Sequence, residues 1–369
     1  MPKILSKNRV MHITYSLGTG GMEKLVREIV ERTDPSMFES SVCCLWIKGR
    51  FSEDLEKRGI KVCCMDKRDG FDHSLFSRMA DIFKKEKISI VHSHDSSANL
   101  YASVSARLAG VKKVFNTEHG GIYFETERKK KINRLLCLLN KKVICVSDSI
   151  KNDLMGMGLP EIKLKVIPNG LDFSEFDIEL DRNRKRRDLG LCESDFVISS
   201  IGRLSKVKNH EMLLASVKPI LQRMSNAKII IAGDGPLRQV LEERAKEYTS
   251  SGRVLFLGTR KDVPEILKIS DCFVACSESE SFGLSVLEAM AAGVPVVSTC
   301  AGGLKEIVKD GVTGILISKN DAGALVDGIY RIYSDKLYAQ GNASRAKEMV
   351  KISYGVDQMV KRYQELYLS

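Results

Sequence analysis

Two glutamates lie eight positions apart in the segment Glu280-Ser-Phe-Gly-Leu-Ser-Val-Leu-Glu288. The apolar run after Gly283 predicts a helix that begins near this glycine, so Glu280 lies in the preceding loop and Glu288 on the helix. The first backbone N–H groups of a helix lack partners and carry roughly half a positive charge, so they attract phosphate. Carboxylates accept hydrogen bonds from hydroxyl groups. The segment is therefore suited to a ligand that carries both hydroxyl groups and phosphate.

Two cationic side chains, Arg203 and Lys208, follow another apolar run, in the segment Gly202-Arg203-Leu-Ser-Lys-Val-Lys208. The single glycine and the lack of Gly-Lys-Ser/Thr exclude a P-loop. The Arg203 guanidinium offers a planar fork and the Lys208 ammonium a point charge, and together they suit a diphosphate. Ordinary surface charge is the competing interpretation.

Two further candidate loops follow apolar runs in the first half of the chain. In Leu17-Gly-Thr-Gly20-Gly21, the paired glycines let a ligand approach the backbone amides, although a tight strand-to-helix turn explains them equally well. This loop lacks the third glycine of the dinucleotide-binding fingerprint. In Thr117-Glu118-His119-Gly120-Gly121, the imidazole of His119 is placed to hydrogen-bond a hydroxyl group.

Short apolar runs alternate with amphipathic segments along most of the chain, which predicts parallel sheets covered by helices, an α/β fold. The first series of strands is expected at 10–15, 41–46, 61–65, 88–92, 113–116, 142–146 and 165–167. A charged stretch without steady period, 172–189, indicates a linker. The second series is expected at 196–201, 228–232, 254–257, 272–275, 296–298 and 314–316. In such sheets the binding crevice lies at the carboxyl ends of the strands, where all four candidate loops fall.

Composition describes a globular protein of two domains, with 369 residues and 43% hydrophobic content. No apolar run approaches the ~20 residues of a membrane span, and the N-terminus lacks the apolar core of a signal peptide, so we expect a cytoplasmic protein. The ten cysteines include no Cys-x-x-Cys and are interpreted as reduced thiols. His92-Ser-His94 places two rings on one face of a strand, and polar strand ends lining a cleft are favoured there over a zinc site.

A net charge of +11 calls for an anionic partner or a solvated basic surface. The positive residues cluster at 84–85, 112–113, 128–131, 141–142 and 182–187. Solvated faces are one interpretation, and contact with anionic lipid or a lipid-diphosphate acceptor is the other. Nucleic acid is not expected, because the basic runs have little aromatic interleaving and match no recognised binding motif.

In order along the chain, six segments resemble those of the family-four retaining glycosyltransferases. They are Gly20-Gly21-Met22-Glu23, Thr117-Glu118-His119-Gly120, Val166-Ile-Pro-Asn-Gly-Leu-Asp172, Gly202-Arg203 with Lys208, Gly233-Asp-Gly-Pro-Leu-Arg238 and Glu280-x7-Glu288. The resemblance implies the GT-B fold, in which two Rossmann-like domains face each other across a central cleft. It predicts an acceptor-side domain at 1–171, a linker at 172–189 and a nucleotide-sugar-binding domain at 190–352. The last helix, 353–369, is expected to cross back to the first domain.

The resemblance also implies a role for each candidate residue. Arg203 and Lys208 should grip the donor diphosphate, Glu288 the ribose and Glu280 the hydroxyl groups of the transferred sugar. The remaining expected contacts are the backbone amides of Phe282, Gly283 and Leu284 near sugar and phosphate, His119 beside the reacting carbon, and Gly20 and Gly21 near the donor phosphates. Ser281 stands where many relatives have glycine. No Asp-x-Asp triplet is present, so we expect no metal or other cofactor, with positive side chains taking the metal's place.

The expected activity is transfer of a sugar with retained anomeric configuration, with a UDP-sugar as the default donor. The basic first domain favours a saccharide or lipid-linked saccharide as acceptor, as in the assembly of a bacterial surface polysaccharide, and peripheral attachment to the inner face of the plasma membrane. Two alternatives remain open. A nucleotide-sugar epimerase of related fold would need no separate acceptor. A non-catalytic nucleotide-sugar-binding module would not need His119 and Glu280 beside the reacting carbon.

Overall fold

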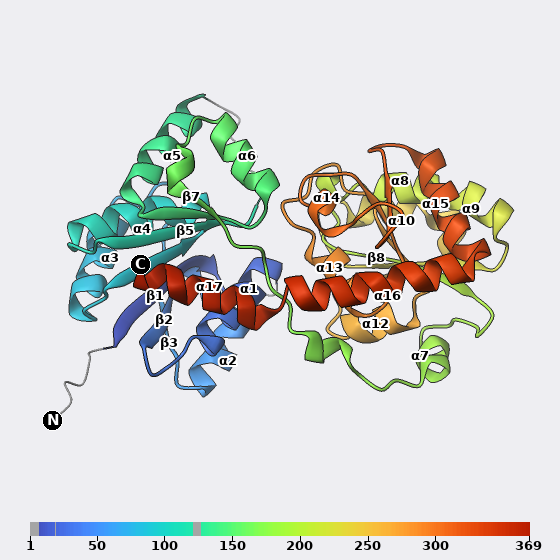
Figure 1. The fold of residues 1–369 in the computed structure, drawn as a ribbon, viewed down its shortest axis with the longest axis horizontal. Helices are drawn as coiled ribbons and strands as arrows, with labels where there is room; N and C mark the ends of the chain where they lie inside the picture. The colour runs from blue at the N-terminus through green and yellow to red at the C-terminus, as the bar shows by residue number, and fades with distance from the viewer. Residues whose placement is uncertain (1–6, 19, 121–126) are drawn as a thin grey trace. The chain divides into compact units, whose positions relative to one another are not determined.

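The structure is a computed structural model that describes residues 7–18, 20–120 and 127–369 (Figure 1). The chain forms two compact units. The N-terminal unit comprises Met1–Gly170 together with Val356–Ser369, and the C-terminal unit comprises Leu171–Gly355. The last helix of the chain therefore belongs to the N-terminal unit. All ten cysteines are free thiols.

The N-terminal unit is built on a seven-stranded parallel sheet with the order β3-β2-β1-β4-β5-β6-β7. Its strands are β1 (Asn8–Ser16), β2 (Phe38–Ile47), β3 (Lys61–Cys64), β4 (Ile90–His94), β5 (Lys113–Glu118), β6 (Lys142–Cys145) and β7 (Leu164–Val166). Its helices are α1 (Gly21–Arg32), α2 (Arg50–Lys57), α3 (Ser74–Lys85), α4 (Ser96–Leu108), α5 (Glu127–Leu139), α6 (Asp148–Gly156), the 3-10 turn η1 (Glu161–Lys163) and α17 (Val356–Leu368).

The C-terminal unit has a six-stranded parallel sheet with the order β10-β9-β8-β11-β12-β13. Its strands are β8 (Phe196–Ile201), β9 (Ala227–Ala232), β10 (Val254–Gly258), β11 (Cys272–Ala275), β12 (Val296–Thr299) and β13 (Ile315–Ile317). Its helices are η2 (Phe173–Phe176), α7 (Arg182–Asp188), η3 (Lys206–Lys208), α8 (His210–Ala215), α9 (Val217–Arg223), α10 (Arg238–Arg244), α11 (Lys246–Ser250), α12 (Val263–Ile269), α13 (Leu284–Ala291), α14 (Leu304–Ile307), α15 (Ala322–Ser334) and α16 (Lys336–Ser353).

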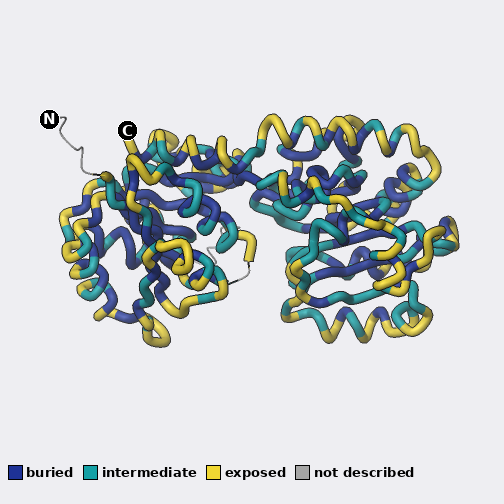
Figure 2. The backbone as a smooth tube through the Cα atoms, turned by 90° about the horizontal axis from the view of Figure 1, so that it is seen from below, coloured by how far each residue is buried: buried dark blue, intermediate teal, exposed yellow. Residues whose placement is uncertain are grey.

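Each of the thirteen strands expected from the apolar runs is found in the structure. The runs are nearly continuous because both faces of each sheet are covered by helices (Figure 2). In β1, Met11 and Ile13 pack toward α3 and α4. Residues of the neighbouring β2 that face the other way, Val42 and Cys44, pack with side chains of α1 and α2.

Both sheets reverse their strand order beside their first strand, between β1 and β4 and between β8 and β11. A parallel α/β sheet opens its binding crevice at such a switch point, at the carboxyl ends of the strands. Gly20 and Gly21 follow β1, His119 follows β5, Arg203 follows β8 and Glu280 follows β11. The topology therefore places every candidate loop at the carboxyl-end edge of its own sheet.

The segment 172–189, which the sequence predicts as a linker, contains regular structure. It holds η2 and α7, and Arg186 on α7 is buried. The Arg186 guanidinium donates to the Asp271 carboxylate at 2.7 Å and to the Ile269 carbonyl at 2.9 Å. Phe176 is buried as well, and Leu180 and Leu189 pack against the cluster that contains Ile266, so ionic and apolar contacts together attach the stretch to the C-terminal unit.

Candidate functional site

Four loops pack closely in two pairs, at the carboxyl ends of β8 and β9 and of β11 and β12, and glycines allow this approach. Gly233 has a φ of 140°, and a Cβ added there would lie 1.9 Å from the carbonyl oxygen of Gly202. Gly302 has a φ of 48°, and a Cβ there would lie 2.1 Å from the carbonyl oxygen of Glu280. The glycine turns at 233–235 and 302–303 therefore hold the loops that carry Arg203 and Glu280 in place.

Lys208 and Glu280, 72 residues apart in sequence, form an ion pair. Their side chains are 25% and 16% exposed, so the pair can be reached from solvent. Glu280 also accepts a hydrogen bond from the Ser277 hydroxyl at 3.3 Å. The aliphatic stem of Lys208 lies 3.6 Å from where a Cβ of Gly202 would be, which is an ordinary packing distance.

A small pocket opens beside this ion pair, within the C-terminal unit. Its lining includes Lys208, His210, Ser277 and Ser285. Ser285 lies in the first turn of α13, so the pocket brings the Lys208 side chain and the first turn of that helix to one place. An anion in the pocket would meet positive charge from both.

Helix α13 begins where the sequence predicted, with Gly283 as its N-cap residue at a φ of 105°. This positive φ favours glycine, and a Cβ there would also lie 2.4 Å from a methyl group of Leu304, whose side chain would have to shift. The Phe282 side chain is buried against Tyr354, with ring centroids 5.6 Å apart, which leaves its backbone amide as the group that could serve a ligand. Leu284 opens the helix and Glu288 is half-buried on it.

Two other residues near the candidate loops of the C-terminal unit differ in their surroundings. Arg203 is exposed, and no ion pair is found for it among the described residues. His210 is buried, which lowers the pKa of its imidazole to about 4. The sequence analysis did not identify His210 as a candidate. Its position next to Lys208-Asn209 could have indicated it, because Asn209 caps α8 in a left-handed conformation and His210 is the first residue of that helix.

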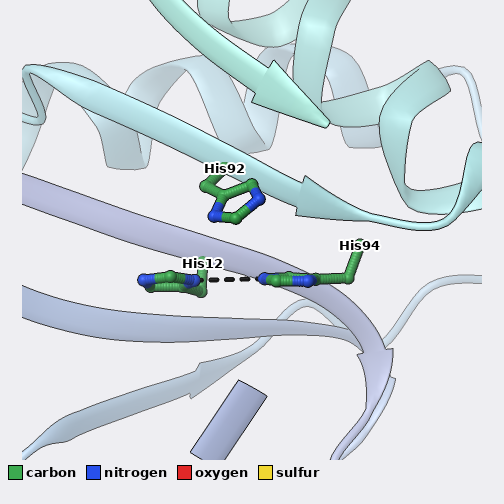
Figure 3. Close-up of side chains that lie close together, drawn as sticks. All are labelled: His12, His92 and His94. Atoms are coloured by element: carbon green, nitrogen blue, oxygen red, sulfur yellow. Dashed lines mark hydrogen bonds between the residues drawn. The ribbon is translucent and has the colours of Figure 1, made fainter. Parts of the chain in front are cut away.

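In the N-terminal unit, His119 lies at the end of a chain of hydrogen-bonded imidazoles (Figure 3 shows its inner part). His119 Nε2 lies 2.9 Å from His94 Nδ1, and His94 Nε2 lies 3.1 Å from His12 Nδ1. We call these three residues the imidazole chain. Burial lowers the pKa of His12 and His119 to about 3 and holds the pKa of His94 well below its usual range, so the rings are neutral.

His92 packs on this chain and joins it to the last helix. Its ring centroid lies 4.3 Å from that of His94. Its Nδ1 lies 2.6 Å from the Tyr367 hydroxyl on α17, and its Nε2 lies 2.8 Å from the Thr117 hydroxyl. His92 and His94 are therefore fully enclosed side chains, whereas the sequence interpretation placed them as polar strand ends lining a cleft. The α17 residues Tyr363 and Tyr367, which are far away in sequence, pack on the His92 ring, and the His94 ring lies among other histidine rings.

Sequence reasoning did not include His12, which is paired with His92 in the register of β1 and β4. The signal was a single polar residue inside the apolar run of β1. Ligand atoms of His12, His92 and His94 all lie within 4.8 Å of one another, a spacing that could hold a metal ion. A metal there would have to replace hydrogen bonds that each of the three rings already makes.

Two carboxyl groups adjoin His119. Asp95, at the N-cap of α4, has a φ of 70° and a ψ of 160°, a conformation that glycine normally occupies and that stores strain. Its carboxylate accepts the backbone N–H of His119 at 3.2 Å. Burial, followed by the nearby Asp95 charge, raises the pKa of Glu118 to about 7. Asp95 thus anchors the loop that carries His119.

Gly20 and Gly21 are exposed at the start of α1, with Gly20 as N-cap residue. A Cβ at Gly20 would lie 2.3 Å from a carboxylate oxygen of Glu23, so that carboxylate folds over the helix N-terminus. Gly121 and the side chains of Arg128 and Lys129 lie outside the described residues. A separate hollow in this unit is lined by Arg9, Glu39, Lys61 and Glu86, at the amino ends of the strands and away from the candidate loops.

Comparison with known proteins agrees with this architecture. The family model for Glycosyltransferase Family 4 matches residues 19–175, and the model for Glycosyl transferases group 1 matches residues 181–351. The chain is 31% identical over 306 residues to the UDP-Gal:alpha-D-GlcNAc-diphosphoundecaprenol alpha-1,3-galactosyltransferase of Escherichia coli. The aligned region covers 78% of this chain and 77% of that protein. It is 28% identical over 302 residues to the N-acetyl-alpha-D-glucosaminyl L-malate synthase of Bacillus anthracis, which covers 80% and 79%.

In structure, the chain is similar to Anabaena HepE in complex with UDP and glucose, with a TM-score of 0.86 and 23% identity over 97% of this chain and 98% of that one. Its two parallel-sheet units match the Rossmann-like domains of the GT-B fold. The chain belongs to the family-four glycosyltransferases. It is an enzyme of the glycosyltransferase class that uses a nucleotide-sugar donor.

Proposed function

We propose that this enzyme transfers a sugar from a UDP-sugar to a lipid-linked saccharide, with retained configuration and without a metal ion. The observation that carries the proposal is the pocket of the C-terminal unit, where the Lys208 ammonium meets the N-terminus of α13. Positive groups aimed at a leaving diphosphate do the work that a divalent metal does elsewhere, because the diphosphate gains charge in the transition state. UDP as the carrier is supported by the similarity to the Escherichia coli enzyme named for UDP-Gal and to HepE in complex with UDP and glucose.

In this proposal, Lys208 exchanges one anion for another when the donor binds. Without donor, its ammonium is paired with Glu280. A partly exposed pair of this kind is worth about 0–1 kcal/mol, so opening it is easy. The donor diphosphate then takes the ammonium, with Arg203 as a second cation, and the released Glu280 carboxylate accepts hydrogen bonds from sugar hydroxyl groups.

The other site residues complete the donor and acceptor contacts. We assign Glu288 to the ribose, and the amides of Phe282, Gly283 and Leu284 to the sugar and phosphates. In the N-terminal unit, His119 is assigned a place beside the reacting carbon. Gly20 and Gly21 are assigned to the donor phosphates, where the positive end of α1 favours an anion. Retained configuration is an inference from the family resemblance.

The test is nucleotide release from a panel of UDP-, GDP- and ADP-sugars, in the presence of chelator. Each donor is offered with an undecaprenyl-diphosphate-linked GlcNAc, with a soluble saccharide and with L-malate. Lys208→Ala should lower kcat about 100-fold or more, as expected when one donor to a developing oxyanion is lost, and Glu280→Ala should also lower it. Lys206→Ala is the matched control, because this exposed lysine lies in the same η3 turn.

Chelator-resistant release with one UDP-sugar and the lipid-linked acceptor, lost in Lys208→Ala and kept in Lys206→Ala, would support the proposal. Activity that disappears in chelator and returns with Mg²⁺ would refute metal independence. Turnover with L-malate or a soluble saccharide alone would refute the lipid-linked acceptor. Specific donor binding without turnover under every acceptor would favour a binding module. Interconversion of sugars without an acceptor would favour an epimerase.

We further propose that helix α5 holds the enzyme at an anionic membrane surface. The helix exposes three large apolar side chains at helical spacing, Ile132, Leu135 and Leu138, which are 40%, 63% and 57% exposed. The exposed Lys131 and Arg134 lie among them. Exposed apolar residues flanked by basic ones are typical of helices that lie in a lipid headgroup layer. No helix in the described part of the chain combines the length and apolar character needed to cross a membrane.

Sedimentation with vesicles tests this attachment. Binding to vesicles with phosphatidylglycerol, weaker binding to pure phosphatidylcholine, and loss of binding in Leu135→Glu are expected. Leu108→Glu is the matched control, because Leu108 is 58% exposed and ends α4 in the same unit. Equal binding by Leu135→Glu and the unaltered protein would refute a role for α5.

A further inference from the structure

The imidazole chain has only one consistent way to share its protons once its direction is chosen. A neutral imidazole has one N–H donor and one bare nitrogen that accepts. The contacts between His12 and His94, at 3.1 Å, and between His94 and His119, at 2.9 Å, each need one donor and one acceptor. If His12 donates to His94, then His94 must donate to His119. If His119 donates inward, all three rings must reverse.

The two ends of the chain decide its direction. His12 Nε2 and His119 Nδ1 have no hydrogen-bond partner in the part of the chain that the structure describes, and neither atom is exposed. His12 is 0% exposed and lies at the centre of the sheet, whereas His119 is half-buried at the strand-end loop. Buried N–H groups without a partner are rarer than buried acceptors without one. Either direction leaves one of these two atoms as an unpaired buried N–H. Only the outer one, on His119 at the strand-end loop, lies where a bound ligand could supply an acceptor, so we place the bare nitrogen at the inner end.

We propose that His94, backed by His12, fixes His119 in the tautomer that carries its proton on Nδ1, so that His119 presents an N–H donor to the oxygen of a bound ligand. His12 Nδ1–H donates to His94 Nε2, and His94 Nδ1–H donates to His119 Nε2. His94 is thus a positioning residue that acts through His119. The place of His119 beside the reacting sugar rests on the proposed function, whereas the tautomer rests only on the imidazole chain.

Two further features hold the chain in this state. Burial lowers the pKa of all three imidazoles, which keeps each ring neutral and limits it to a single proton. The Asp95 carboxylate accepts the backbone N–H of His119 and so fixes the loop relative to α4. The surroundings of His119 therefore fix its proton on one ring nitrogen, whereas the proton of a free histidine exchanges between both ring nitrogens.

The tautomer can be measured directly, because the chain has six histidines in total. With ¹⁵N-labelled histidine, spectra that correlate ring protons with ring nitrogens distinguish a protonated nitrogen from a bare one. Each signal is assigned by single substitution, and the exposed His73 serves as an unconstrained reference. We expect protonated Nδ1 and bare Nε2 in His12, His94 and His119.

Substitutions of His94 test the coupling. His94→Phe removes the donor, so His119 should change to the Nε2–H tautomer. His94→Asn keeps an amide N–H near the position of Nδ1, so it should restore the Nδ1–H form. His92→Phe is the matched control, because His92 is equally buried on the same strand but bonds to Tyr367 and Thr117. Thermal melts identify any variant that has unfolded.

Transfer kinetics add a second readout. We expect kcat to fall about tenfold in His94→Phe and to recover to within about threefold in His94→Asn, with a smaller change in KM for the donor. An unchanged kcat in a folded His94→Phe would overturn the positioning role. A protonated Nε2 on His119 in the unaltered protein would overturn the tautomer. So would stoichiometric Zn²⁺ binding that shifts the His12, His92 and His94 signals together. Absence of all transfer activity with the expected spectrum would refute the proposed function and leave the tautomer established.

Discussion

Acid should destabilise the N-terminal unit far more than the C-terminal unit. Burial lowers the pKa of five histidines, and four of them, His12, His92, His94 and His119, lie in the N-terminal unit. The fifth, His210, lies in the C-terminal unit. The two units therefore take part unequally in any proton uptake that accompanies unfolding.

The sign follows from where the protons bind. An unfolded histidine has a pKa near 6.5, so the unfolded chain takes up protons first as the pH falls, while the native rings stay neutral. The stability that each ring contributes is complete above about pH 6.5 and is lost below it. Between pH 7.5 and pH 5.5, each buried histidine lowers the unfolding free energy by about 1.4 kcal/mol. The four histidines of the N-terminal unit therefore lower it by roughly 5–6 kcal/mol.

Glu118 acts in the opposite direction. Its pKa is raised to about 7, so the native carboxyl takes up a proton before the unfolded one and stability rises on acidification through pH 7. Over the same pH range, protonation of Glu118 raises the unfolding free energy of the native N-terminal unit by about 2 kcal/mol. From these groups together, the N-terminal unit should lose about 4 kcal/mol and the C-terminal unit about 1.4 kcal/mol. Because domains are commonly stable by about 5–15 kcal/mol, the first loss should bring the N-terminal unit close to unfolding.

Urea unfolding at pH 7.5 and pH 5.5 measures this difference. The protein has a single tryptophan, Trp46, which lies half-exposed on β2, so its fluorescence reports the N-terminal unit. Circular dichroism follows both units. The tryptophan transition should move to much lower urea at pH 5.5, and the second transition should move little. His92→Phe should reduce the pH effect by about 1.4 kcal/mol, and a substitution of the exposed His73 should leave it unchanged. Equal shifts of both transitions would refute the reasoning.

Three other substitutions have defined outcomes. Gly283→Ala should lower the unfolding free energy of the C-terminal unit by about 1–3 kcal/mol in urea, because its φ is 105° and its Cβ would lie 2.4 Å from Leu304; no loss would contradict that geometry. Tyr367→Phe should lower the unfolding free energy of the N-terminal unit by about 1–3 kcal/mol, because it leaves His92 Nδ1 without its hydrogen-bond partner. An unchanged unfolding free energy would exclude that hydrogen bond. Glu118→Gln should stabilise the N-terminal unit at pH 8 by about 1–3 kcal/mol. The effect should be smaller at pH 5.5, where the native carboxyl is already protonated. The same effect at both pH values would contradict the raised pKa of Glu118.

Much of the architecture follows from local sequence patterns. The strands were predictable because parallel strands covered on both faces need unbroken apolar runs, and these runs stand out between amphipathic segments. The position of each candidate loop followed from a general property of such sheets, whose strands all end at one edge. The start of α13 was predictable from Gly283, because the positive φ at that position requires glycine.

Other features depend on contacts between residues that are distant in sequence. The pairing of Lys208 with Glu280 spans 72 residues, and the pocket beside it needs β8 and β11 as neighbours. In the segment 172–189, predicted as a linker, α7 attaches through the buried Arg186, a contact that a search for hydrophobic periodicity does not detect.

The sequence alone therefore determined the fold class, the strand-end loops and the residue types that suit a nucleotide sugar, because these depend on local periodicity and on side-chain chemistry. Only the tertiary structure decided the surroundings of each functional group. His12, His94 and His119 come from three different strands or strand ends, and they become one hydrogen-bonded chain because β1, β4 and β5 are neighbours in the sheet. Burial of this chain lowers the pKa of each ring, and burial is a property of the packed molecule.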